Sequence, residues 1–258
     1  MNGTMRMIGR VMIVGLATLC AAALYGCSEA TPAPSSGFAE NTEMMSAQQG
    51  TPFQRAYWNR SFDPKSYDEL YIAPVNTDYI MAQNFWEKAS LASIDKAQVK
   101  KDVATIAEFT RQSFMRAVAD DPRHRFKLVD KPGEHTLILE LALTQLVPSK
   151  AVLNAIGYVT WIPTVVALGG STATQSQDTG KGVVAIEGRV RDGSSGEIIG
   201  MFADRQHPAT AIIDLKALNW WAPARGIIDQ WSKQLVALAN RPAGAVVKDM
   251  PQFELLVW

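Results

Sequence analysis

The hydrophobic positions of this 258-residue chain repeat with two different periods. Alternate positions are apolar in residues 136–147, where leucines fall on one side, and in residues 183–191, where Glu and Arg occupy the opposite side. Shorter apolar runs bounded by turn residues predict further strands at 69–75, 126–130 and 197–204. The leucine side of 136–147 is predicted to be core.

The helical period predicts two long helices. Residues 98–120 carry an apolar stripe between the capping residue Asp95 and Pro122, and residues 225–239 carry another before Pro242. Because helices are segregated from strands that can pair antiparallel, we expect an α+β fold. It would have a mainly antiparallel sheet of about five strands, with both helices packed on one face.

Residues 151–177 interrupt two predicted strands without a single charged residue. Gly157 and Pro163 would break a membrane-spanning helix there, so spanning is the less favoured interpretation. The segment is either a connection folded over the domain's own core or an apolar patch that contacts a membrane or partner. The candidate interface residues are Tyr158, Trp161, Ile162 and Val165.

The N-terminus has the order of a secretory signal. Arg6 and Arg10 precede an almost wholly apolar run that is too short for a permanent membrane helix. The sequence Leu24-Tyr25-Gly26-Cys27 then resembles the lipobox of bacterial lipoproteins, with Cys27 as the lipidated first residue. The alternative is cleavage after Ala23, which would release a soluble protein.

Residue composition completes the predicted organisation. Residues 1–26 form the signal, 27–51 a Pro- and Ser-rich flexible tether, 52–240 one domain, and 241–258 a tail. Acyl chains on Cys27 would make membrane lipid the first partner. Because Ser28 rather than Asp follows the cysteine, resemblance to sorted lipoproteins implies the outer membrane, with the domain facing the periplasm.

Composition also excludes some functions. Lys and Arg number 25 and Asp and Glu number 25, so no net field recruits nucleic acid. After lipidation of Cys27 no thiol remains for a disulfide. The fold must therefore rest on its core.

Candidate chemistry is sparse. His124, His135 and His207 lack the spacing of a zinc site, so no metal is expected, and no cofactor motif stands in a suitable context. Arg189, Arg191, Asp192 and Glu197 could form cross-strand ion pairs on the polar face of their hairpin, which is a structural role. We expect no enzymatic activity.

With these segments placed, the chain resembles DUF3313, a domain-of-unknown-function family of bacterial lipoproteins. The matching features are short: Ser36-Gly37-Phe38, Tyr67-Asp68 leading into Ile72-Ala73-Pro74-Val75, Thr144, Ile186-Glu187-Gly188, Asp192 and Gly196-Glu197. The resemblance implies an envelope lipoprotein and names no site.

Two functional hypotheses follow. In the first, the protein is a periplasm-facing binding or assembly module that contacts an envelope protein or another copy of itself. In the second, it is an enzyme or a carrier of a small ligand, such as a lipid or cell-wall fragment, with a site that no motif reveals.

Overall fold

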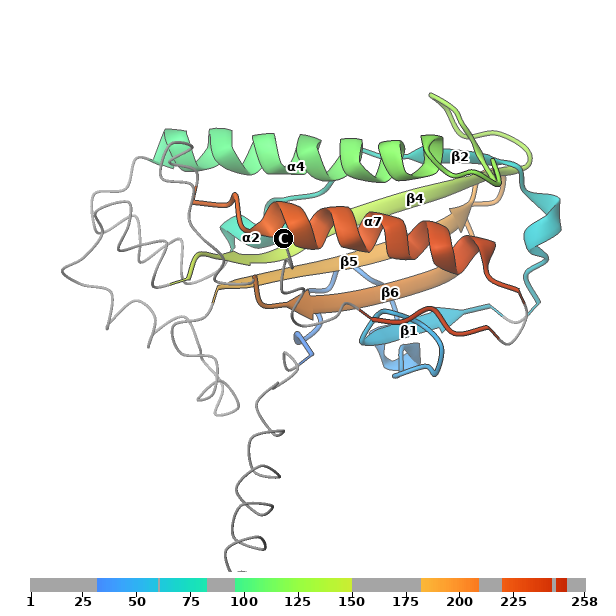
Figure 1. Cartoon of the computed structure of the whole chain (residues 1–258), viewed down its shortest axis with the longest axis horizontal. Coiled ribbons are helices and arrows are strands. Elements are labelled where there is room, and N and C mark those ends of the chain that lie inside the picture. The colour runs from blue at the N-terminus through green and yellow to red at the C-terminus, as the bar shows by residue number, and fades with distance from the viewer. Residues whose placement is uncertain are drawn as a thin grey trace, which may run out of the picture.

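The computed structural model describes residues 32–59, 61–82, 96–149, 182–208, 220–242 and 245–249. A six-stranded sheet with the order β1-β6-β5-β4-β2-β3 forms its centre (Figure 1). The strands are β1 (Arg55–Trp58), β2 (Glu69–Ile72), β3 (Lys127–Leu128), β4 (Thr136–Val147), β5 (Val183–Asp192) and β6 (Ile198–Gln206). The α+β class is confirmed.

The sheet differs in detail from the prediction of about five mainly antiparallel strands. Strands β4, β5, β6 and β1 are antiparallel neighbours, but β2 runs parallel to both β3 and β4. The parallel pairing of β2 with β3 follows from the helix α4 (Lys96–Ala119), which lies between the two strands in the chain. Strand β1 was not predicted, because it has only four residues at the sheet edge.

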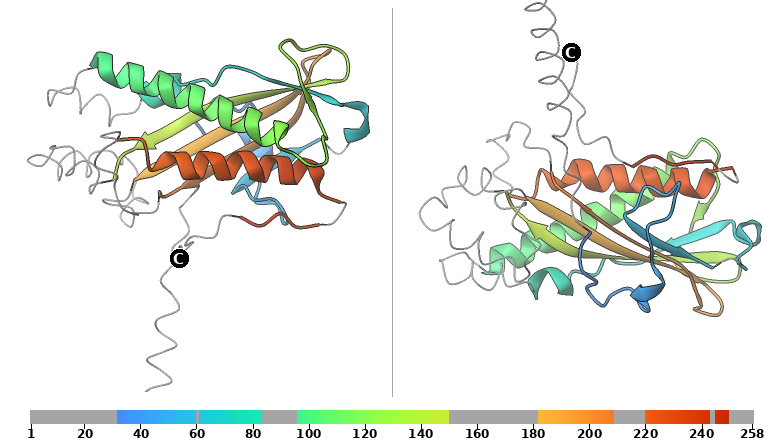
Figure 2. Two further views of the ribbon diagram at one scale, coloured as in Figure 1. Left: turned by 45° about the horizontal axis from the view of Figure 1, so that its top comes forward. Right: turned by 90° about the horizontal axis from the view of Figure 1, so that it is seen from below.

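Two long helices cover one face of the sheet, as predicted. Helix α4 and helix α7 (Ala224–Asn240) lie side by side over the strands (Figures 1 and 2). Between these layers lie Leu139 and Leu141 of β4, Phe114 of α4 and Trp231 of α7, all buried. The leucine side of β4 is therefore core.

Three short helices complete the elements that the structure describes: η1 (Thr42–Met44), η2 (Pro64–Ser66) and α2 (Asp78–Met81). None of these helices is predicted by the hydrophobic pattern, which needs more than one turn to show a period. In the described ranges we find no helix with both the length and the apolar character needed to cross a membrane.

An N-terminal segment, residues 32–50, packs on the face of the sheet opposite the helices (Figure 2). Phe38, Ala39 and Met45 are buried, and Ala39 and Met45 form a small second core with Met201 of β6. This differs from the flexible tether predicted over residues 27–51. The buried residues follow no strand or helix period, so the hydrophobic pattern gave no sign of them.

Part of the predicted tail also packs on the domain. The backbone N–H of Val247 donates to the carbonyl of Gly50 at 3.1 Å, and Arg241 donates to the same carbonyl at 2.8 Å. Val247 is packed against the main core. The described ends of the N-terminal segment and of the tail are thus held together.

Candidate ligand-binding cavity

A cavity of about 280 Å³ lies between the sheet and the helical layer, at the end where α4 and α7 both finish. Its wall is strongly apolar. It includes Leu70, Leu139 and Val190 of the sheet, Phe114 and Val118 of α4, and Leu235 of α7. Strands and helices from distant parts of the chain thus enclose a space that can accept an apolar group.

Trp58 at the sheet edge forms part of the cavity wall. Its ring lies over Gly200 of the neighbouring strand, where a Cβ atom would overlap the indole, so only glycine leaves room for it. The indole Nε1 of Trp58 is buried and has no hydrogen-bond partner among the described residues. A buried N–H without a partner costs about 1 to 3 kcal/mol, so the close packing of the indole against Gly200 carries that cost.

The polar part of the wall comes from the turn after α4. Asp121 is buried there and accepts hydrogen bonds from the backbone N–H groups of Arg123 and Arg125. Burial opposes its ionisation, but hydrogen bonds from Asn240 and from those two backbone groups outweigh burial and lower the pKa of the carboxyl. Asp121 is therefore ionised and ties the turn to the end of α7.

Three arginines surround this turn and the end of α7. Arg125 donates to the carbonyl of Tyr67 at 2.7 Å and to that of Pro64, and its guanidinium lies 4.3 Å from the centroid of the Phe126 ring. Arg123 donates to the carbonyl of Asn240 at 2.5 Å. Within the described ranges, none of Arg123, Arg125 and Arg241 forms an ion pair with a carboxylate.

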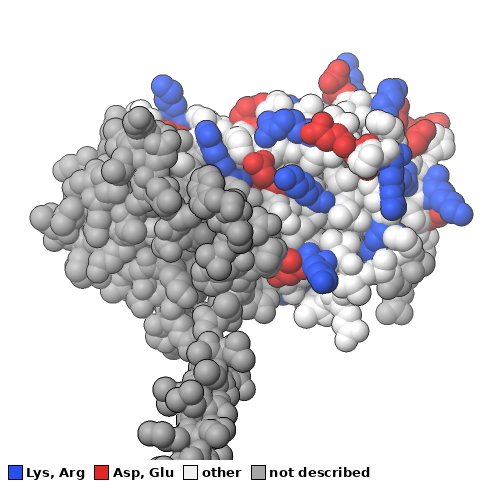
Figure 3. Space-filling view, viewed as in Figure 1, with Lys and Arg blue, Asp and Glu red and all other residues white. Residues whose placement is uncertain are grey.

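Basic side chains gather at this end of the helical face in Figure 3, with acidic ones beside them.

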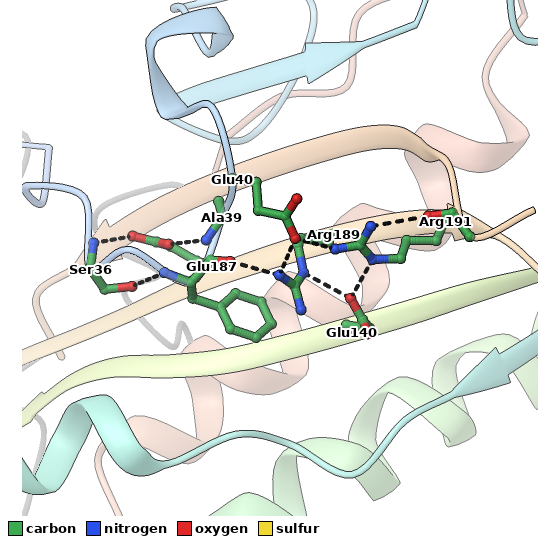
Figure 4. A network of polar contacts seen from close by, with 9 residues as sticks. Ser36, Ala39, Glu40, Glu140, Glu187, Arg189 and Arg191 are labelled. Carbon is green, nitrogen blue, oxygen red and sulfur yellow. Dashed lines mark hydrogen bonds and ion pairs between the residues drawn. The ribbon is translucent and has the colours of Figure 1, made fainter.

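The other polar cluster lies on the opposite face of the sheet and holds the N-terminal segment (Figure 4). Glu187 accepts from the backbone N–H groups of Ser36 at 2.8 Å and Ala39 at 3.0 Å. Arg189 and Arg191 both pair with Glu140 of β4 and with Glu40 of the segment, so two positive charges meet two negative ones. The arginines therefore pair with β4 and with the N-terminal segment rather than with Asp192 and Glu197 of their own hairpin. These ion pairs attach the segment and do not form a site.

The sequence also marks other residues as site candidates. Cys27 and the candidate interface residues Tyr158, Trp161, Ile162 and Val165 lie outside the described residues. His135 contacts the carbonyl of Ser66 through Nδ1 at 2.8 Å. In the described part of the chain no group of three His, Cys, Asp or Glu side chains could hold a metal ion.

The sequence alone does not reveal this cavity. Its wall combines β1, β2, β4, β5, β6, both long helices and two turns, so no single stretch of sequence carries a signal for it. One weak signal of the cavity is present in the sequence. A glycine within a strand, Gly200, leaves room for an aromatic ring from the neighbouring strand, and here that ring is Trp58.

The fold and the cavity define an α+β domain with a candidate site for an apolar group between its two layers. The family model of DUF3313, a protein family of unknown function, matches residues 34–235, so the chain belongs to that family. The resemblance noted in the sequence is confirmed. No curated protein matches the chain.

Two solved structures are among those to which the chain shows similarity. The PelC dodecamer from Paraburkholderia phytofirmans has 8% identity and a TM-score of 0.35, covering 70% of this chain and 94% of that chain. A protein from Xanthomonas campestris described by the family DUF330 has 11% identity and a TM-score of 0.40, covering 73% of this chain and 91% of that chain.

Proposed function

We propose that this protein is an envelope lipoprotein that binds a small ligand through the ligand's apolar part. The observation that carries the proposal is the cavity of about 280 Å³ with its aliphatic and aromatic wall. Small-molecule sites in proteins are concave and mostly apolar, with volumes from about 300 Å³ upward. At about 280 Å³ the cavity lies just below that range and suits a slender ligand.

The proposed anchor is an acylated Cys27 in the outer membrane, with the domain on the periplasmic side. The carbonyl of Ala33 already accepts a hydrogen bond from Arg55 of β1 at 2.8 Å, so only about six residues separate Cys27 from the first contact with the sheet. Fully extended, such a stretch reaches about 20 Å, against about four times that for a tether ending at residue 51. The proposal therefore places the domain close to the membrane, where apolar ligands are concentrated.

Binding rather than catalysis is the proposed activity. Among the residues of the cavity wall, Asp121 is the only carboxylate, and it is already engaged by three hydrogen-bond donors. The wall offers no nucleophile beside a general base, which acyl transfer or hydrolysis would need.

The test is displacement of an apolar fluorescent dye from the mature chain carrying Cys27→Ser, which avoids detergent in the sample. Val236 of α7 lines the cavity and is half-buried, so Val236→Trp should fill the cavity from its outer side and reduce dye affinity at least tenfold. Val246→Trp is the matched control, because Val246 is 69% exposed. Equal dye binding by both variants would reject the cavity as the site.

A second candidate function is a protein interface formed by residues 151–177. Strands β4 and β5 remain paired up to Val147 and Val183, so the connection between them leaves from the end of a complete ladder. A short Gly-Ser linker in place of 151–177 should therefore leave the sheet intact. Loss of a partner or of homo-oligomers in cross-linking, with unchanged stability, would support the interface; unfolding would reject it.

A further inference from the structure

We infer that the ligand of this cavity is a single-chain amphiphile with an anionic head group, such as a carboxylate or a phosphate. The inference rests on the proposed binding function and adds the chemical class of the ligand. It follows from the size of the apolar space and from the charges at one side of it.

The volume limits the apolar part to one chain. An apolar cavity of about 150 Å³ lined by Leu, Ile and Phe stays dry and accepts benzene. The present cavity, at about 280 Å³, is nearly twice as large and has the same kind of wall. It therefore accommodates roughly a dozen carbon atoms, which suits one alkyl chain and excludes the paired chains of a diacyl lipid.

The charges beside the cavity favour an anion. Arg125 and Arg241 belong to the wall, and Arg123 binds the last carbonyl of α7 next to it. Within the wall, the two arginines stand against one carboxylate, Asp121, which leaves an excess of one positive charge. Outside the wall, Arg123 is offset by the exposed Asp120 and by the partial negative charges at the C-terminal ends of α4 and α7.

The guanidinium groups are held in place but keep free donors. Each guanidinium has five N–H donors. Within the described ranges, Arg241 uses one of them on the carbonyl of Gly50, and Arg125 uses two on those of Tyr67 and Pro64. Because neutral carbonyls orient these side chains without cancelling their charge, a carboxylate or phosphate oxygen can bind them with little further ordering.

Four ligands with the same twelve-carbon chain test the inference on the mature Cys27→Ser protein: dodecanoate, dodecyl phosphate, monolauroylglycerol and dodecyltrimethylammonium. Each is titrated below its micelle concentration, and displacement of the bound dye is measured at low and high salt. We expect at least one of the anions to bind at least tenfold more tightly than the neutral ligand. The cationic ligand should bind most weakly, and added salt should reduce the preference for the anion.

Arg241→Gln should reduce the affinity for the anion about tenfold and leave the affinity for monolauroylglycerol unchanged. Arg116→Gln is the matched control, since Arg116 lies on α4 outside the cavity wall and pairs with Asp229. Equal affinity of the wild-type protein for anionic and neutral ligands would overturn the head-group inference while leaving the binding function intact. Failure of all four ligands to displace the dye would overturn both.

Discussion

Glu187 in the middle of β5 accepts a hydrogen bond from the backbone N–H of Ala39 at 3.0 Å, although the two residues are 148 positions apart. The second carboxylate oxygen accepts from Ser36, and the side chain is only 1% exposed. A buried carboxylate is tolerated when hydrogen bonds satisfy it. This contact therefore fixes where the N-terminal segment joins the domain.

Glu187→Gln should loosen the N-terminal segment. Glutamine has one acceptor oxygen, and its NH₂ group would face a backbone N–H donor, so one hydrogen bond is lost and one donor is left unsatisfied. We expect a loss of about 1 to 3 kcal/mol in the free energy of unfolding. Proteolysis within residues 36–50 should become faster. Glu43→Gln, at an exposed position in the same segment, is the control, and equal behaviour of both variants would show that the contact is unimportant.

Asp204 gives the domain a predicted pH dependence. Burial raises the pKa of its carboxyl to about 6, although hydrogen bonds from Gln206 and from the Trp231 indole, at 2.6 Å, act in the opposite direction. Between about pH 4 and pH 6 the native state then binds more protons than the unfolded chain, so stability falls as pH rises. The full change corresponds to about 3 kcal/mol.

Asp204→Asn should remove this fall, because asparagine does not ionise and its oxygen can still accept from Trp231. Urea unfolding at several pH values from 4 to 7 measures the effect. The exposed Asp130 provides the control Asp130→Asn, which should keep the wild-type slope. A slope unchanged in Asp204→Asn would show that Asp204 does not titrate in this window.

The core assignment of the long β4 strand predicts a large effect of truncation. Leu141 is 1% exposed and lies outside the cavity wall, so Leu141→Ala should lower the free energy of unfolding by about 2 to 5 kcal/mol. Leu139→Ala should cost a similar amount and also enlarge the cavity. Denaturant unfolding measures both, with Met44→Ala on the surface as control. A change within error at both leucines would contradict the core assignment.

The long strand β4 and the long helix α7 could be predicted from sequence. Their apolar residues repeat with one period over many positions, so a single residue that departs from it does not hide the pattern. Residues 136–147 match β4 at both ends, since leucines alternate from Leu137 to Leu143 and the buried face continues at Leu146 after an irregularity in the ladder. Helix α7 begins one residue before and ends one residue after the predicted 225–239. In both cases burial of one continuous face determines the structure, and that face is visible in the sequence.

The N-terminal segment and the cavity could not be predicted for a different physical reason. Phe38 and Met45 are buried by a chain without regular structure over most of its length, so their spacing carries no period. The cavity depends on which elements end at the same place, and Trp58 enters its wall because Gly200 lies beside it. Such contacts arise from tertiary packing alone.

Substitution of Cys27 tests the proposed lipid anchor. Cys27→Ser should abolish acylation and move the protein from the membrane to the soluble fraction, because multiple acyl chains are needed for stable attachment. Metabolic labelling with a fatty-acid analogue and fractionation measure this, and Cys20→Ser in the signal should keep both label and attachment. A Cys27→Ser protein that stayed in the membrane fraction would contradict anchoring through this cysteine.

A crystal structure with a brominated ligand would show whether the cavity binds an apolar chain. The mature Cys27→Ser protein would be crystallised with 12-bromododecanoate, and the anomalous signal of bromine would locate the chain. We expect a bromine peak inside the cavity, between Leu139 of the sheet and Leu235 of α7. A cavity left empty at saturating ligand, or bromine bound only elsewhere on the protein, would contradict it.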